Sequence, residues 1–598
     1  MFTTRPEITG TFGAVASTHW LASAAGMAML EAGGNAFDAA VAAGFALQVV
    51  EPHLNGPGGE VPIVLYDTRR GDGLDGVEVI CGQGVAPAGA TIEHYRGLGL
   101  DLVPGAGLLA TVVPGSFDAW MLMLRDHGTL MPRDVLAHAI DYAENGFVIV
   151  PTIADTIERV EDLLRDEWPT SAALYLPRGS RPKAGSQFSN PTLAATYKRL
   201  LTEGEAVGGD REAQIEAMRA TWYRGFVAEE IDRFCRENEL MDSSGQRHAG
   251  VLTGDDMAGW QASKERPVTF DYHGYTLCKG GAWSQGPVFL QQLALLSGFD
   301  LATMDPLGPD FVHTVVECAK LAFADREAFY GDPNFIDVPL DTLLSADYAD
   351  RRRKLVGDDA SLTLRPGEIA GFETSLEHAL AAHGALDDDF DALGGGEPTV
   401  QTGGAGGDTC HIDVIDRQGN MVSATPSGGW LQSSPIIPEL GFCLNSRAQM
   451  FWLEEGLPAS LAPGKRPRTT LSVNLALKDG RPQMVFGTPG GDYQDQWTLT
   501  FFLRHVHHGM NLQESIDTPM FQTDHMPSSF WPRNADLGSL VLEERFSGAT
   551  SDELKRRGHR VSLVDGWSLG RLSAVRRDNG FIKAAANPRF MQGYAIGR

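Results

Sequence analysis

The sequence predicts a fold that mixes α-helices and β-strands, and three patterns along the 598-residue chain support this. An alanine-rich segment near the N-terminus has the composition of buried helices. Two apolar runs, at 61–66 and 77–81, have the length and the β-branched content of buried strands. A third pattern begins at Thr409, where apolar and polar residues alternate as in a half-buried strand. With 43% hydrophobic and 9% aromatic residues, the chain has enough apolar material for a large core.

The N-terminal two thirds of the chain is expected to be mostly helical. Ser17 or Thr18 can cap a first helix that ends at the glycine pair 33–34, and a second helix is expected from about 37 to 50. The apolar run 39–50 is too short to span a bilayer, so we interpret it as a buried helix. Apolar periodicity predicts further helices across 114–326, with loops at 177–179 and 208–209.

The remaining third is expected to be richer in strands. Residues 387–408 are acidic and then glycine-rich, which is typical of a mobile leader. A strand from Thr409 is expected to return as a hairpin, because 417–420 favours a turn before the apolar segment 421–425. Further strands are expected at 471–477 and 483–487, joined by a turn at 478–480. A helix is expected from 494 to 508.

Charge and cysteine content exclude several classes of function. The net charge of −28 argues against nucleic acid or an anionic membrane as a partner, because both select for basic surfaces. The six cysteines are scattered and form no CxxC pair, so neither a zinc site nor a dense disulfide framework is expected. We therefore expect no metal and no cofactor. Residues 1–10 lack the apolar core of a signal peptide, which predicts a cytoplasmic protein.

Thr409 has the local setting of a self-cleaving N-terminal nucleophile. It is a hydroxyl residue at the head of a predicted strand, directly behind the glycine-rich leader. Its Oγ would attack the carbonyl of Asp408, and an N-to-O acyl shift with ester hydrolysis would free the Thr409 amine. That amine would then act as the general base for its own hydroxyl. The same local pattern also fits a glycine-rich surface loop that runs into an ordinary strand.

Motifs spread over nearly the whole chain distinguish these alternatives. The segment Thr409-Cys410-His411, with Asp416, Gly419-Asn420 and 422–425, resembles the catalytic segment of the γ-glutamyltransferase family. Segments that resemble other landmarks of this family, in the family's order, are 33–40, 51–53, 56–59, 284–287, 322–326, 331–333, 465–472 and 487–491. Several separated motifs in one order are far more specific than any one of them.

The resemblance implies a fold and a processing scheme. The fold is α+β, the four-layer αββα sandwich of the N-terminal nucleophile hydrolases. One precursor would be cut between Asp408 and Thr409 into a large subunit, 1–408, and a small catalytic subunit, 409–598. The two subunits would stay interlocked. Gly490 and Gly491 stand at the family's oxyanion-hole turn, where their backbone N–H groups would stabilise the developing negative charge.

Several hydroxyl residues match positions in the family's site. Thr425 matches a threonine of the catalytic segment, and on a paired strand it would come close enough to hydrogen-bond Thr409. Ser427 matches a further hydroxyl position, and Thr469 and Thr470 stand where family hydroxyls contact the substrate. Each also has an ordinary structural interpretation: an edge-strand residue bonded to water for the first two, and a hydroxyl pair bonded to backbone at a strand start for the others.

The substrate pocket departs from that of the glutathione-cleaving members. Those members bind the substrate α-carboxylate with an arginine, here aligned with Gln83, and the α-amino group with an acidic residue, here aligned with Met450. An ammonium group in that place would lose a charged hydrogen bond worth roughly 1.5–3 kcal/mol. Arg447 resembles an arginine of the acylase-like and oxamate-hydrolase-like branches, and we expect it either to bind a substrate carboxylate or to be structural.

The resemblance therefore predicts a self-processing amide hydrolase or acyltransferase that acts on a small-molecule amide. Within the same family, the alternative is a hydrolase of a non-glutamyl amide, such as an acylase or an oxamate-like amidase. A third possibility is a catalytically silent binding protein that keeps the fold. Self-cleavage separates the last possibility from the other two.

Overall fold

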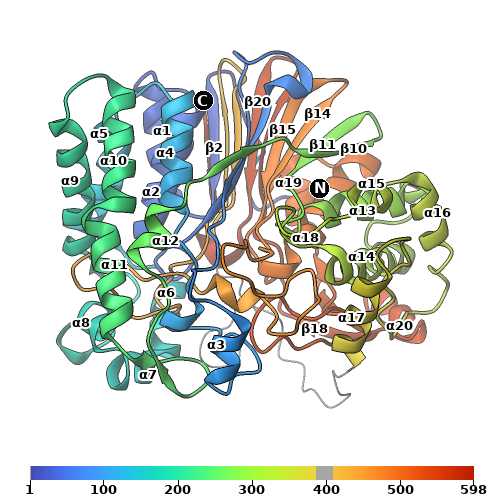
Figure 1. Ribbon diagram of the computed structural model, residues 1–598. Coiled ribbons are helices and arrows are strands. Elements are labelled where there is room, and N and C mark those ends of the chain that lie inside the picture. Colours follow the sequence, from blue (N-terminus) through green and yellow to red (C-terminus); the bar gives the residue numbers. More distant parts are fainter. Residues whose placement is uncertain (1, 385–408) are drawn as a thin grey trace.

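Two seven-stranded antiparallel sheets lie face to face at the centre of the computed structural model, which describes residues 2–384 and 409–598 (Figure 1). The first sheet has the order β21-β2-β12-β13-β3-β4-β9, formed by Tyr594–Gly597, Gly13–Ser17, Ile412–Asp416, Met421–Ala424, Val61–Tyr66, Val77–Gly82 and Ser263–Glu265. The second has the order β1-β20-β19-β15-β14-β11-β10, formed by Ile8–Gly10, Phe581–Ala586, Ser573–Asp578, Arg481–Gly487, Asn474–Lys478, Tyr275–Lys279 and Val268–Tyr272.

Helices cover the outer face of each sheet. Against the first sheet and around it lie α1 (Trp20–Glu31), α2 (Ala36–Val50), α4 (Ser116–His127), α5 (Pro132–Asn145), α9 (Pro191–Ala206), α10 (Arg211–Arg224) and α11 (Phe226–Glu237). Against the second lie α13 (Pro287–Leu296), α14 (Pro309–Phe329), α16 (Ala346–Arg353), α18 (Gln494–His508) and α19 (Leu512–Asp517). A smaller sheet, β16-β17-β18 (Phe521–Gln522, Ser539–Glu543 and Arg560–Val564), packs beyond them with α20 (Gly548–Arg556).

Three apolar layers hold this arrangement together, because successive residues of a strand point to opposite faces of its sheet. In β3, Ile63 and Leu65 belong to the core shared with α2 and α4, whereas Val64 and Tyr66 face the second sheet. A third layer, which includes Phe486 of β15, fills the space between the second sheet and its helices. The strands β2, β3, β4, β12 and β13 are therefore buried on both faces, whereas the edge strands β1, β9 and β10 are partly exposed. The predicted four-layer αββα sandwich is confirmed.

Most predicted elements match the structure, with three corrections. His19, rather than Ser17 or Thr18, caps α1, because its Nδ1 accepts the N–H of Leu21. The hairpin β10–β11 lies inside the region expected to be helical, because its alternating aromatic and β-branched residues turn at His273-Gly274. The strand expected from Thr409 begins as regular β-structure only at Ile412, the first residue of β12. Thr409 lies before it and forms an isolated β-bridge with Ser427.

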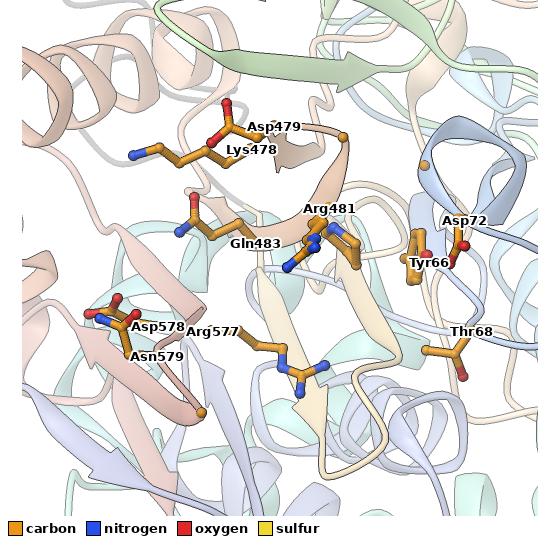
Figure 2. Close-up of a pocket in the computed structure, with 14 residues that line it drawn as sticks. Tyr66, Thr68, Asp72, Lys478, Asp479, Arg481, Gln483, Arg577, Asp578 and Asn579 are labelled. Carbon is orange, nitrogen blue, oxygen red and sulfur yellow. The ribbon is translucent and has the colours of Figure 1, made fainter.

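The two ends of the sandwich differ in character. Hairpin turns gather at one end around a pocket of about 1150 Å³, shown in Figure 2. Lys478, Arg481 and Arg577 line it together with Asp479 and Asp578, so opposite charges share one rim. Thr409 lies at the other end of β12. None of the helices in the described ranges is long and apolar enough to cross a membrane.

Candidate active site

A row of polar residues crosses three neighbouring strands at the end of the first sheet. Thr409 forms a bridge with Ser427, and Ser427 forms a second bridge with Glu60. Residues that face one another across strands point to the same side of a sheet. In these strands that side faces the second sheet, since Ile415, Met421 and Val64, at even spacings from the row, lie in the layer between the sheets. Thr409, Ser427 and Glu60 therefore share one buried face.

Thr409 is buried and held from both sides. Its Oγ1 lies 3.1 Å from Oγ of Ser427. The next residue, Cys410, donates its backbone N–H to Pro426 at 2.9 Å and its thiol to Glu51 at 2.9 Å. The predicted leader from about 387 and the predicted cleavage partner Asp408 lie outside the described residues.

Thr425 stands two ladder positions away from the place expected for it. The register pairs Ile412 with Ala424, which sets Thr425 opposite His411 and Ser427 opposite Thr409. Thr425 donates to the carbonyl of Ser472 at 3.0 Å, and its Oγ1 lies 2.9 Å from His411 Nδ1. Among the described residues, Ser427 rather than Thr425 is therefore hydrogen-bonded to Thr409.

His411 continues this network into the second sheet. Its Nε2 lies 3.0 Å from Asp413 Oδ1, and Asp413 Oδ2 accepts a hydrogen bond from Ser573 at 2.7 Å. A Cβ on Gly487 would lie 2.1 Å from the imidazole. The absence of a side chain at Gly487 thus allows the end of β15 to pack against the His411 ring, directly before β12.

The predicted oxyanion turn directly follows β15. Gly490 and Gly491 have φ of 132° and 55°, a backbone region that favours glycine. A Cβ on Gly490 would lie 2.3 Å from the Trp497 ring. The carbonyl of Gly491 accepts Gln285 Nε2 at 3.3 Å, and the following Asp492 is ion-paired with buried Arg326. The turn is thereby fixed from the side of α13 and α14.

The predicted pocket residues Thr469 and Thr470 lie shortly before β14 of the second sheet. Thr469 forms a bridge with Ser284 and donates its N–H to the Trp283 carbonyl at 2.9 Å. Thr470 is buried, and no group in the described ranges hydrogen-bonds its Oγ1. The backbone of Thr469 is therefore fixed, whereas the buried Thr470 hydroxyl has no hydrogen bond from the described residues.

Gln83 and Glu60 lie side by side at the end of the first sheet. The last β3–β4 pair is Val61–Gly82, so Glu60 and Gln83 are the next residues on the two chains. Gln83 donates Nε2 to the Gly84 carbonyl at 3.2 Å, and its buried Oε1 has no hydrogen-bond partner among the described residues. Oε2 of Glu60 is also buried, and it too has no hydrogen-bond partner among the described residues.

Arg447 is fully buried and already neutralised. Its Nε is ion-paired with Glu60 Oε1, and its Nη2 donates to Ser427 Oγ. Its guanidinium also lies 4.9 Å from the centre of the Trp430 ring. Burial raises the pKa of Glu60 to about 7, and Arg447 opposes part of that rise. A substrate carboxylate at Arg447 would have to compete with Glu60.

Comparisons with known proteins show the same organisation. A sequence model described as Gamma-glutamyltranspeptidase matches residues 22–597. The glutathione hydrolase-like YwrD proenzyme of Bacillus subtilis (strain 168) is 30% identical over 99% of both chains. The acylase ACY 1 proenzyme of Pseudomonas sp. (strain SE83) is 31% identical over 92% of this chain and 88% of its own. A solved structure of LmbA2991HD is 56% identical, with a TM-score of 0.91 and 100% of both chains covered.

The chain belongs to the γ-glutamyltranspeptidase family. The predicted resemblance to this family and to its acylase-like branch is confirmed. The chain is accordingly a hydrolase or acyltransferase of γ-glutamyltranspeptidase type, with the N-terminal nucleophile hydrolase fold. Family relatives named as proenzymes fit the expectation of two subunits from one precursor.

Glu60 is the site residue that sequence reasoning missed in this γ-glutamyltranspeptidase relative. The sequence did contain a signal: residues 52–66 include no Asp, Glu, Lys or Arg other than Glu60. An isolated acid between glycines and a fully apolar strand has no ordinary solvent-exposed role, since β3 is buried on both faces.

A group of potential metal ligands lies away from this row. His313, Glu317 and His559 offer ligand atoms within 4.8 Å of one another. The two imidazoles hydrogen-bond each other at 2.9 Å, and Glu317 is ion-paired with Lys320 at 2.6 Å and Arg365 at 3.0 Å. Protein partners therefore already use these groups, and we interpret the cluster as a structural network.

Proposed function

We propose that this chain cleaves itself before Thr409 and then hydrolyses a small-molecule amide through the Thr409 hydroxyl. The observation that supports this most strongly is the position of Thr409. It lies at the end of a ladder of paired strands, on a buried polar face, with its Oγ1 3.1 Å from Ser427. Such a hydroxyl is held in one orientation before any substrate arrives, which lowers the entropic cost of attack.

The processing step needs only groups of this chain and water. Thr409 Oγ would attack the carbonyl carbon of residue 408, and the peptide nitrogen would leave as the amine of Thr409. The resulting ester would be hydrolysed by water, which frees the Thr409 hydroxyl and leaves a carboxylate on residue 408. Ser427 would orient the attacking oxygen, since the two hydroxyls share a hydrogen bond.

Turnover would follow the same chemistry with an external amide. The free amine of Thr409 would take the proton from its own Oγ, and Oγ would attack the substrate carbonyl. The backbone N–H groups of Gly490 and Gly491 would stabilise the oxyanion. The leaving amine would take the proton, and water would then release the acyl group from the ester. We expect hydrolysis to dominate transfer, because water is always available.

The substrate we favour is a neutral, non-glutamyl amide. Gln83 and Met450 supply neither charge of the clamp expected in glutathione-cleaving relatives, and both are buried. Arg447 has a counter-charge in Glu60, so a substrate carboxylate gains less from it than the sequence predicted. The similarity to an acylase proenzyme supports the same choice.

Gel mobility and turnover together test this proposal. Purified protein should run as two fragments of about two thirds and one third of the chain, with Thr409 at the new N-terminus. Thr409→Ala should remain intact and inactive, and Thr409→Ser should be cut at a reduced rate. Thr409→Ala protein already cut at this bond would overturn the proposal. A wild-type chain that stays intact and inactive would favour the silent binding protein.

A substrate panel tests the second half. Mature enzyme should hydrolyse neutral acyl para-nitroanilides with a higher kcat/KM than the γ-glutamyl compound. A clear preference for the γ-glutamyl compound, unaffected by Arg447→Lys, would instead restore the standard activity of the family.

A further inference from the structure

Two buried acceptor atoms on the face that carries Thr409 have no hydrogen-bond partner in the part of the chain that the structure describes. They are Oε2 of Glu60 and Oε1 of Gln83, and no described residue donates a hydrogen bond to either. A buried polar atom without a hydrogen-bond partner destabilises the folded protein. Two such atoms in neighbouring residues, at the end of one pair of strands, indicate a place that a donor group fills during function.

These atoms lie on the face that carries Thr409. Glu60 is the third member of the bridged row from Thr409 through Ser427, and Gln83 is next across the strand pair. Neighbouring strands are about 4.8 Å apart, so the backbones of Thr409 and Glu60 are roughly 10 Å apart. An acyl chain of several atoms, with its carbonyl at Thr409, spans that separation when both side chains extend toward it.

The surroundings of Glu60 leave one oxygen available to a ligand. Arg447 is ion-paired with Oε1, and Oε2 has no hydrogen-bond partner among residues 2–384 and 409–598. A Cβ on Gly428 would lie 2.5 Å from Oε2, and Gly428 has φ of 76°. Any larger residue at position 428 would press on this oxygen, which is buried beside the glycine.

Charge decides which donor fits. Above pH 7, where Glu60 is mostly ionised, its carboxylate is balanced by the guanidinium of Arg447, and Gln83 is neutral. An ammonium group here would bring an unbalanced charge into a buried site, which is strongly unfavourable. A hydroxyl or an amide N–H supplies the missing hydrogen bond without that penalty.

We propose that Glu60 Oε2 and Gln83 Oε1 form an acceptor subsite that recognises a neutral hydrogen-bond donor, a hydroxyl or an amide N–H, on the acyl part of the substrate. This subsite rests on the proposed amide hydrolysis and narrows its substrate class. It makes both residues specificity-determining, because a site built around buried acceptors rejects an acyl group that leaves them unpaired.

The test compares matched para-nitroanilides whose acyl chains end in a hydroxyl, a methyl or an ammonium group, over a series of chain lengths. At the best length, wild-type enzyme should prefer the hydroxyl over the methyl compound by roughly 10-fold or more in kcat/KM. The ammonium compound should be the poorest. No preference for the hydroxyl at any length would overturn the subsite.

Glu60→Gln makes the sharper prediction. Arg447 donates to the side chain at position 60, so the glutamine carbonyl oxygen will face Arg447 and its NH2 group will take the place of Oε2. The variant should therefore lose the preference for a hydroxyl and favour acyl chains that end in a ketone. Gln83→Leu, which removes the second acceptor with little change in volume, should also reduce the hydroxyl preference.

Controls separate this role from others. The control variant is Glu78→Gln. Glu78 is another buried carboxylate with an arginine partner, and it lies on β4 near the end of the sandwich where the hairpin turns gather. This variant should leave the ratio of kcat/KM between the hydroxyl and methyl substrates unchanged. If Glu60→Gln slows self-cleavage and all substrates by the same factor, Glu60 acts only through Arg447 and the subsite proposal is wrong. Failure of the proposed function would look different: the wild-type chain would stay uncut and inactive. Gel electrophoresis shows whether the chain is cut before any substrates are compared.

Discussion

At the scale of single residues, the site depends on which hydroxyl lies opposite Thr409. The strand register sets Ser427 there and Thr425 opposite His411, so the two hydroxyls serve different neighbours. Ser427 touches the proposed nucleophile directly. Thr425 is linked instead to the His411–Asp413 pair beneath it. Two hydroxyls only two positions apart in the sequence thus have separable roles.

Ser427→Ala should slow self-cleavage and turnover by roughly 10- to 100-fold, because the Thr409 hydroxyl loses a buried hydrogen bond worth about 1–3 kcal/mol. Single-turnover rates of cleavage, measured on freshly refolded protein, report this directly. Ser515→Ala is the matched control: Ser515 is also buried, and its hydroxyl has no hydrogen-bond partner in the described ranges. Equal rates in Ser427→Ala and in wild type would remove Ser427 from the site.

At the scale of elements, the turn that follows β15 must approach β12 closely. Gly487 allows this, because a side chain there would occupy the position of the His411 ring. The close approach of a strand end to an imidazole couples the geometry of the proposed oxyanion turn to that of β12. A change in one should therefore be visible in the other.

Gly487→Ala should lower stability by about 1–3 kcal/mol and reduce self-cleavage together, because His411 has to move and carries Thr425 with it. Thermal unfolding and the rate of cleavage measure the two effects. Gly97→Ala is a suitable control, since a Cβ there would meet no atom within 4 Å. A stable Gly487→Ala protein with wild-type cleavage would show that the approach of β15 to β12 has no catalytic role.

His525 lies in the segment that connects β16 to β17 of the small sheet, and its charge is expected to depend on pH. Burial, with Lys320, Arg365 and Arg560 nearby, lowers its pKa to about 3 from 6.5. The folded state therefore binds fewer protons than the unfolded state between these values. The stability that His525 contributes is present above pH 6.5 and is lost as the pH falls below it.

Wild-type protein should lose roughly 2 kcal/mol from this residue between pH 7.5 and pH 5. His525→Gln lacks the titrating group, so its stability should change less over that range. Denaturant unfolding of both proteins at the two pH values gives the difference. An identical pH dependence in both would show that His525 is not the responsible group.

Elements with a strong local pattern could be predicted, whereas contacts across strands could not. The helix Gln494–His508 and the strand at 61–66 match their predictions because periodicity and boundary residues agree. The hairpin Val268–Lys279 was missed inside a helical region, since its pairing with β14 comes from distant residues. Glu60 was missed for the same reason. Its role depends on Arg447, which lies 387 positions along the chain.

At the scale of the whole molecule, both sheets combine strands from the two sides of Thr409. In the first sheet β2 lies between β21 and β12, and β13 pairs with β3. In the second, β1 pairs with β20 and β11 with β14. Among the described residues, neither side of Thr409 contains a complete seven-stranded sheet of its own.

Expressing 1–408 and 409–598 from separate genes should therefore give little folded protein when each is produced alone, because unpaired strand edges promote aggregation. Co-expression should recover a smaller amount of active enzyme than the intact gene does. Size-exclusion chromatography and the para-nitroanilide assay measure the yield. A soluble, folded 409–598 fragment on its own would contradict this view of the sheets.

The interleaved strands also bear on how the enzyme is assembled. A single precursor delivers the two future pieces in a strict one-to-one ratio, and the peptide link between them acts as a tether of high effective concentration while the sheets form. Once strands from both pieces alternate in the ladders, the tether is no longer needed. The proposed cleavage would then generate the reactive amine only in molecules that have already folded, so an unfolded chain would not expose a competent nucleophile.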